Sequence, residues 1–181
     1  MQARLTRRAA LGGAGVLVLA SCGGDDSPPA GKPPAGSGAG LLNSIVALEH
    51  ASVAAWAAIA SALSGRARSQ AKAIRRREQQ HVARVSALVR DLGGSPPEGR
   101  PAREYAPMFP KLTDGADALH FAHDLEERLV RAYLDALRSL PEPRQRRAAA
   151  EIAAEEAQDL AVVQLLSGEP ASTKPFVTGT S

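Results

Sequence analysis

Four segments of the chain carry apolar residues with helical spacing, and the four are similar in length. They run from about Leu41 to Ser64, from about Ala67 to Leu92, from Asp114 to just before Pro141, and from Pro143 to Gly168. Asp114 suits an N-cap, Pro143 a first helical position and Gly168 a C-terminal cap. At a rise of about 1.5 Å per residue, each helix would be roughly 36 Å long. The matched lengths predict an all-α bundle.

The connections between these segments predict the topology. The first and the last connection span only a few residues, so each joins two helices into an antiparallel hairpin. The middle connection, residues 93–113, is long and rich in proline, which is unusual inside a compact domain. A connection of this length can run along the bundle and return the chain to its starting end. We therefore expect a four-helix bundle made of two hairpins and one long crossover.

The first helical segment is apolar enough to raise the alternative of a membrane span. It contains Glu49 and His50, however, and a carboxylate near the centre of a bilayer costs a few kcal/mol. A helix buried in the core of a bundle is the favoured interpretation.

The second half of the helical region repeats the first. An offset of 77 residues places Glu49 on Glu126 and Trp56 on Tyr133, and an offset of 78 places Glu78 on Glu156 and His81 on Asp159. Apolar pairs with the same offsets include Leu48 with Leu125, Ile74 with Ile152, and Val85 with Val163. The repeat selects Glu126 and Glu156 as the residues that face inward, and it leaves their neighbours Glu127 and Glu155 to solvent.

The acidic residues selected in this way lie at one height. In each antiparallel hairpin, their positions are nearly symmetric about the turn, so all of them fall within about one helical turn of the middle of the bundle. The candidate metal ligands are Glu49, Glu78, His81, Glu126, Glu156 and Asp159. A buried carboxylate is costly unless it is paired or binds a metal, and carboxylate with imidazole suits iron or manganese.

Two positions leave alternatives open. Asp159 stands where the repeat places a second histidine, so it either binds a second ion or faces solvent and that ion is lost. His123, one turn before Glu126, could supply the missing nitrogen, although a partly exposed surface histidine is the simpler interpretation.

The basic run at residues 72–77 is typical of a solvated helix face, and contact with anionic lipid headgroups is the alternative.

At these residues the chain resembles the ferritin-like superfamily and, more narrowly, the uncharacterised exported bacterial ferritin-like lipoproteins. The resemblance covers residues 41–167 and carries the superfamily pattern of Glu, Glu-x-x-His, Glu and Glu-x-x-His, with Asp159 as the departure. It implies a ferritin-like four-helix bundle with a dinuclear Fe or Mn centre and ferroxidase, oxygenase or storage roles. It also implies that Tyr133 can hydrogen-bond a ligand carboxylate, and Trp56 offers an N–H donor at the equivalent position.

The N-terminal region predicts export and lipid anchoring. Residues 1–21 combine the twin arginine Arg7 and Arg8 with an apolar run, and Cys22 follows them directly in a sequence that resembles a lipobox. We expect a Tat-type signal peptide and a mature protein that is anchored through acylated Cys22. Residues 22–40 would form a Gly/Pro/Ser-rich tether, residues 41–168 the bundle, and residues 169–181 a tail without helical pattern.

Composition narrows the function further. Arg4, Arg7 and Arg8 account for the whole net charge of +3, because residues 1–21 contain no acidic residue. No nucleic-acid partner is therefore expected. The favoured interpretation is a metalloprotein tethered to the outer side of the cytoplasmic membrane, at most a dimer. A metal-free helical bundle that serves as an interaction module of the cell envelope is the alternative.

Overall fold

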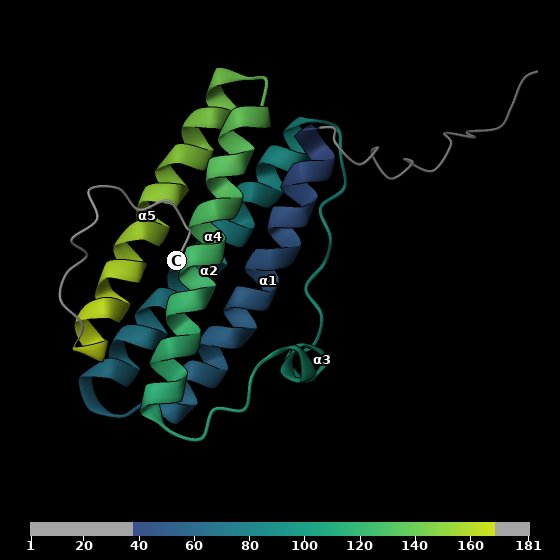
Figure 1. The fold of residues 1–181 in the computed structure, drawn as a ribbon. Coiled ribbons are helices and arrows are strands. Elements are labelled where there is room, and N and C mark those ends of the chain that lie inside the picture. The colour runs from purple at the N-terminus through teal and green to yellow at the C-terminus, as the bar shows by residue number, and fades with distance from the viewer. Residues whose placement is uncertain (1–37, 169–181) are drawn as a thin grey trace, which may run out of the picture.

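The computed structural model describes residues 38–168, which form four long helices and one short helical segment (Figure 1). The elements are α1 (Gly38–Ala62), α2 (Gly65–Asp91), α3 (Ala102–Tyr105), the 3-10 turn η1 (Ala106–Met108), α4 (Gly115–Ser139) and α5 (Pro143–Ser167). No strand occurs within these residues. The prediction of an all-α bundle is confirmed.

The helices form two hairpins, α1 with α2 and α4 with α5, joined by a crossover that runs along the bundle (Figure 1). Helix α1 packs against both α2 and α4, whereas α2 and α5 approach each other less closely. The crossover contains α3 and η1, which the sequence pattern did not predict. Helix α1 begins at Gly38, inside the segment predicted as tether.

Local sequence explains where the helices begin and end. Gly65 has a φ of 53°, which lets the chain reverse between α1 and α2 within two residues, and a side chain there would strain the backbone. The Asp114 carboxylate accepts hydrogen bonds from the backbone N–H groups of Ala116 and Asp117, so it caps α4 as predicted. Pro143 opens α5, and Gly168 ends it in the left-handed conformation.

The core consists of two apolar clusters, one toward each end of the bundle. The first contains Leu42, Val46, Val89 and Ile152, and the second contains Trp56, Ile59, Leu129 and Val163. The central turns of the four helices lie between these clusters. Polar side chains at that height are closed off from water at both ends.

Polar pairs connect α2 and α5, which leaves a seam of charge where these two helices face each other. Four pairs follow one another along the seam: Asp91 with Arg144, Arg84 with Glu151, His81 with Glu155, and Arg77 with Asp159. We call this set the α2–α5 ladder. Its first two pairs are exposed, and its last two adjoin the buried middle of the bundle.

Helix α1 is long and apolar enough to cross a membrane, with a mean hydropathy of 1.5. Within the described residues it is instead a central helix of the bundle, because it buries Glu49 together with Leu42, Val46 and Ile59. Cys22, Arg7 and Arg8, most of the tether and the C-terminal tail lie outside the described residues.

Candidate metal centre

The six predicted ligands are all buried at the middle of the bundle, none more than 2% exposed. The structure brings four of them together. Glu49 from α1, Glu78 and His81 from α2, and Glu156 from α5 each offer one ligand atom, and these atoms lie within 4.8 Å of one another. Glu126 and Asp159 are buried beside this group but do not belong to it. We call the four residues the ligand group.

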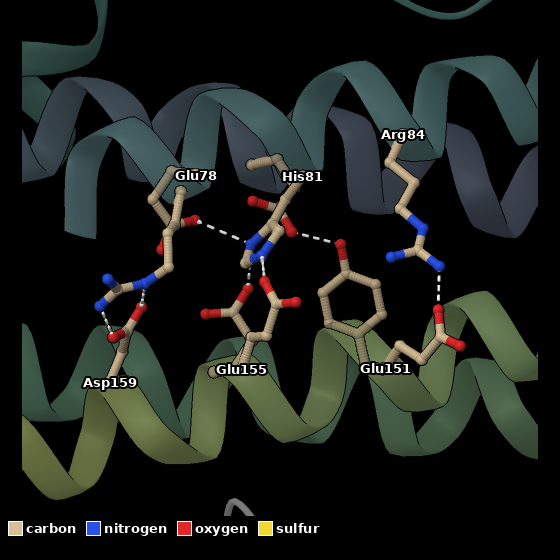
Figure 2. A network of polar contacts seen from close by, with 10 residues as sticks. Glu78, His81, Arg84, Glu151, Glu155 and Asp159 are labelled. Carbon is tan, nitrogen blue, oxygen red and sulfur yellow. Dashed lines mark hydrogen bonds and ion pairs between the residues drawn. The ribbon is translucent and has the colours of Figure 1, made fainter. Parts of the chain in front are cut away.

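His81 is oriented by contacts on both sides of its ring (Figure 2). Its Nε2 lies 2.8 Å from Oε2 of Glu155, while its Nδ1 lies 2.8 Å from Oε1 of Glu156 and 3.9 Å from Oε2 of Glu78. When Nε2 donates its proton to Glu155, a neutral ring presents a lone pair at Nδ1 to these two carboxylates. Lone pairs that face one another in a buried site require a proton or a cation between them.

The carboxylates of the group have few protein donors. Among residues 38–168, no hydrogen-bond donor satisfies either oxygen of Glu78 or of Glu156, nor Oε2 of Glu49. Buried oxygens without a partner are rare in folded proteins, and each needs an explanation. A bound cation would supply the missing partner.

Two aromatic side chains donate hydrogen bonds to glutamates across the interface of α1 and α4, one in each direction. Trp56 donates from Nε1 to Oε1 of Glu126 at 2.9 Å, and the Tyr133 hydroxyl donates to Oε1 of Glu49. The two contacts follow the sequence repeat, since Trp56 corresponds to Tyr133 and Glu49 to Glu126. Each aromatic residue therefore fixes the carboxylate on the opposite helix.

The electrostatics of the site favour neutral acids when no ion is present. Burial, with Glu156 nearby, raises the pKa of Glu49 to about 8. Burial also raises the pKa of the other three glutamates well above the usual value, and neighbouring carboxylates add to this effect; these residues are Glu78, Glu126 and Glu156. A divalent cation would reverse this balance, because it stabilises the ionised forms.

The ligand group fits a divalent metal. It offers three carboxylates and one imidazole nitrogen, a set compatible with Fe²⁺ or Mn²⁺, and its unpartnered oxygens converge on one point. Glu49, Glu78, His81 and Glu156 are the residues that would hold such an ion.

Asp159 has a different environment from the one its position in the repeat suggested. Arg77 donates from Nε to Oδ2 of Asp159 at 2.9 Å and makes a second contact to Oδ1 through Nη2. Burial raises the pKa of Asp159, and the Arg77 guanidinium opposes that effect. Both carboxylate oxygens of Asp159 are thus occupied by a side chain from α2.

Sequence reasoning missed two residues of the site. The repeat left Glu155 to solvent, yet this residue, with its side chain 43% exposed, holds His81 in place. Arg77 was part of the basic run read as a solvated face, yet it pairs with buried Asp159. His123 lies apart from the ligand group, and its ion-pair contacts are with Asp124 and Glu127.

Loss of the Glu155 carboxylate should weaken ion binding without unfolding the bundle. We expect Glu155→Ala to lower the affinity for Mn²⁺ by about 10- to 100-fold, because His81 loses the acceptor that sets its tautomer and orientation. Isothermal titration calorimetry measures this directly. Glu151→Ala is the matched control, since Glu151 sits one step along the same ladder and contacts Arg84 and Arg147. Equal losses in both variants would contradict a specific role for Glu155.

Comparisons with known proteins agree with this architecture. Among solved structures, a conserved hypothetical protein from Mycobacterium tuberculosis matches with a TM-score of 0.65 at 15% identity, over 77% of this chain and 96% of that chain. A point mutant of Dps from Listeria innocua matches with a TM-score of 0.65 at 12% identity, over 75% of this chain and 96% of that one. Among curated proteins, none matches the chain in sequence.

The two structural matches show the fold alone, because their identities are low. The family follows from the sequence itself. A family model described as "Ferritin-like domain" matches residues 37–169, which include all four long helices and every member of the ligand group. The chain therefore belongs to the ferritin-like domain family.

Proposed function

We propose that this protein binds Fe²⁺ or Mn²⁺ in the middle of its bundle and acts on iron or on reactive oxygen species at the outer side of the cytoplasmic membrane. The observation that carries the proposal is the convergence of Glu49, Glu78, His81 and Glu156 on one point, with buried oxygens that no protein donor satisfies. A bound Fe²⁺ would supply one-electron chemistry toward dioxygen or peroxide.

The chain's own residues would set the conditions for that chemistry. Tyr133 fixes the Glu49 carboxylate, and Glu155 fixes the His81 ring, so two ligands are oriented before an ion arrives. The apolar clusters above and below the site exclude water from the ends of the bundle. The site adjoins solvent along the α2–α5 ladder, where the Arg77 and Glu155 side chains are 36% and 43% exposed.

The location is proposed from the N-terminal sequence. Arg7, Arg8 and Cys22 support Tat export and acylation, and the segment that precedes α1 is long enough to hold the bundle away from the lipid surface. Fractionation of a Cys22→Ala variant tests the anchor, since the variant should leave the membrane fraction. An assembly no larger than a dimer stays a prediction.

Elemental analysis of the protein purified from metal-replete cells tests the proposed function. We expect a stoichiometric amount of iron or manganese in the wild type and its loss in Glu78→Ala, because Glu78 offers two unpartnered oxygens to the site. A colorimetric assay of Fe²⁺ consumption under air then tests for oxidation. Only trace metal in the wild type, unchanged in Glu78→Ala, would instead support a metal-free bundle that serves as an interaction module.

A further inference from the structure

The two halves of the centre are related by the sequence repeat, but their charges are reversed. The offset of 78 residues that relates Glu78 to Glu156 also relates His81 to Asp159 and Arg77 to Glu155. In one half, the donor His81 on α2 contacts the acid Glu155 on α5. In the other half, the acid Asp159 on α5 contacts the donor Arg77 on α2. Relative to the His81–Glu155 pair, the Arg77–Asp159 pair therefore has the opposite charge at both repeat positions.

The Arg77 guanidinium lies beside the acids that are left out of the ligand group. It binds both oxygens of Asp159, which is 1% exposed, and the negative charges of Glu78 and Glu126 add to the rise in the pKa of Arg77. Glu126 in turn accepts a hydrogen bond at Oε1 from the Trp56 N–H group. Both oxygens of Asp159 thus face a protein cation, whereas Oε2 of Glu126 and most carboxylate oxygens of the ligand group have no donor among the described residues.

We propose that Arg77 takes the place of a second metal ion, so that the centre holds one divalent ion per chain. The ion is bound by Glu49, Glu78, His81 and Glu156, and the guanidinium supplies the positive charge for Asp159 and Glu126. This inference rests on the proposed function, because it assumes that the ligand group binds a metal.

The position and the charge of Arg77 both indicate that it replaces a second metal ion. A second ion bound by Asp159 would need carboxylate oxygens that Arg77 now occupies in a bidentate pair, the strongest kind of charge-assisted hydrogen bond. It would also lie close to a fixed positive charge, which repels a divalent cation. In the superfamily pattern a histidine at this position would bind a metal. The Asp159 side chain is shorter than histidine, and its carboxylate is already paired with Arg77.

The number of bound ions in a set of variants tests the proposal. The full-length protein is loaded with Mn²⁺, desalted and analysed for manganese per chain, with calorimetric titration for the affinities. We expect one ion in the wild type and in Arg77→Lys, which keeps a positive charge. We expect a second, weaker binding event in Arg77→Gln, because Asp159 and Glu126 lose their cation. The double variant Arg77→Glu, Asp159→His copies the His81–Glu155 pair, and we expect it to bind two ions tightly.

Controls and a spectroscopic measurement make the outcomes distinct. Arg76→Gln removes a neighbouring exposed arginine and should leave one ion. Electron paramagnetic resonance of the Mn²⁺-loaded wild type should give the spectrum of an isolated ion, and the double variant that of two coupled ions. Two ions in the wild type would overturn the role of Arg77 and leave the proposed function standing. One ion in every variant would also overturn it, and no ion in the wild type would reject both proposals.

Discussion

The metal-free protein is expected to lose stability as the pH rises from about 5 to about 8. Glu49 has an ordinary pKa of 4.5, and burial with neighbouring Glu156 raises it to about 8 in the folded state. Between these values the folded protein binds more protons than the unfolded chain, so the free energy of unfolding falls with pH. The slope for one group is about 1.4 kcal/mol per pH unit, or about 4 kcal/mol between pH 5 and pH 8.

A loss of this size is large for a single domain, whose total stability is about 5–15 kcal/mol. We expect the melting temperature of chelator-treated protein to be lower by at least about 10 °C at pH 8 than at pH 5. Addition of Mn²⁺ at pH 8 should recover the difference, because the ion binds the ionised carboxylates of the folded state only. Thermal unfolding followed by circular dichroism measures both effects.

The exposed Glu98 in the crossover provides a control for this experiment. Glu98→Gln should leave both the pH dependence and the effect of Mn²⁺ unchanged. If chelator-treated protein were equally stable at pH 5 and pH 8, and Mn²⁺ had no effect, the raised pKa of Glu49 and the binding of a metal by the glutamates would both be contradicted.

Replacement of Glu78 by glutamine is expected to change metal affinity and metal-free stability in opposite directions. Glu78 is fully buried, belongs to the ligand group, and has two oxygens without a hydrogen-bond partner. Glu78→Gln keeps the shape of the side chain and removes its charge. Affinity for Mn²⁺ should fall by more than about 100-fold, since even a residue that only orients a ligand contributes 10–100-fold.

The same variant should be more stable than the wild type when both are free of metal at pH 8. The ionisation of a buried carboxylate among other carboxylates is removed, and the amide can donate hydrogen bonds to Glu49 or Glu156. Urea unfolding after chelator treatment, with a parallel titration of Mn²⁺, gives both quantities. A variant less stable than the wild type under these conditions would mean that Glu78 has a structural role, not a ligand role.

The internal repeat carried most of what could be predicted from sequence. It identified Glu49, Glu78, Glu126 and Glu156 as inward-facing because helical periodicity and a constant offset both depend on spacing along the chain. All four are buried at the height that the hairpin geometry implied. Helices α3 and η1 escaped prediction because a proline-rich segment of this length shows no regular spacing of apolar residues.

The contacts of Glu155 and Arg77 could not be read from periodicity. Each residue sits next to an inward-facing glutamate, about 100° around its helix, which on an isolated helix points toward solvent. Where α2 faces α5, that direction leads across the interface to the other helix. Whether Glu155 and Arg77 meet solvent or a partner depends on how the two hairpins pack against each other. The spacing of residues within one helix contains no information on this packing.

The α2–α5 ladder also bears on which hairpins recognise each other. If two copies of α5 met in the register that α2 and α5 adopt, Glu155 would stand opposite Asp159, and two acids would be forced together. Two copies of α2 would bring Arg77 against His81. Only the unlike combination joins each acid to a base at these positions. The reversed charges therefore disfavour the pairing of two like helices in this register and favour the pairing of α2 with α5.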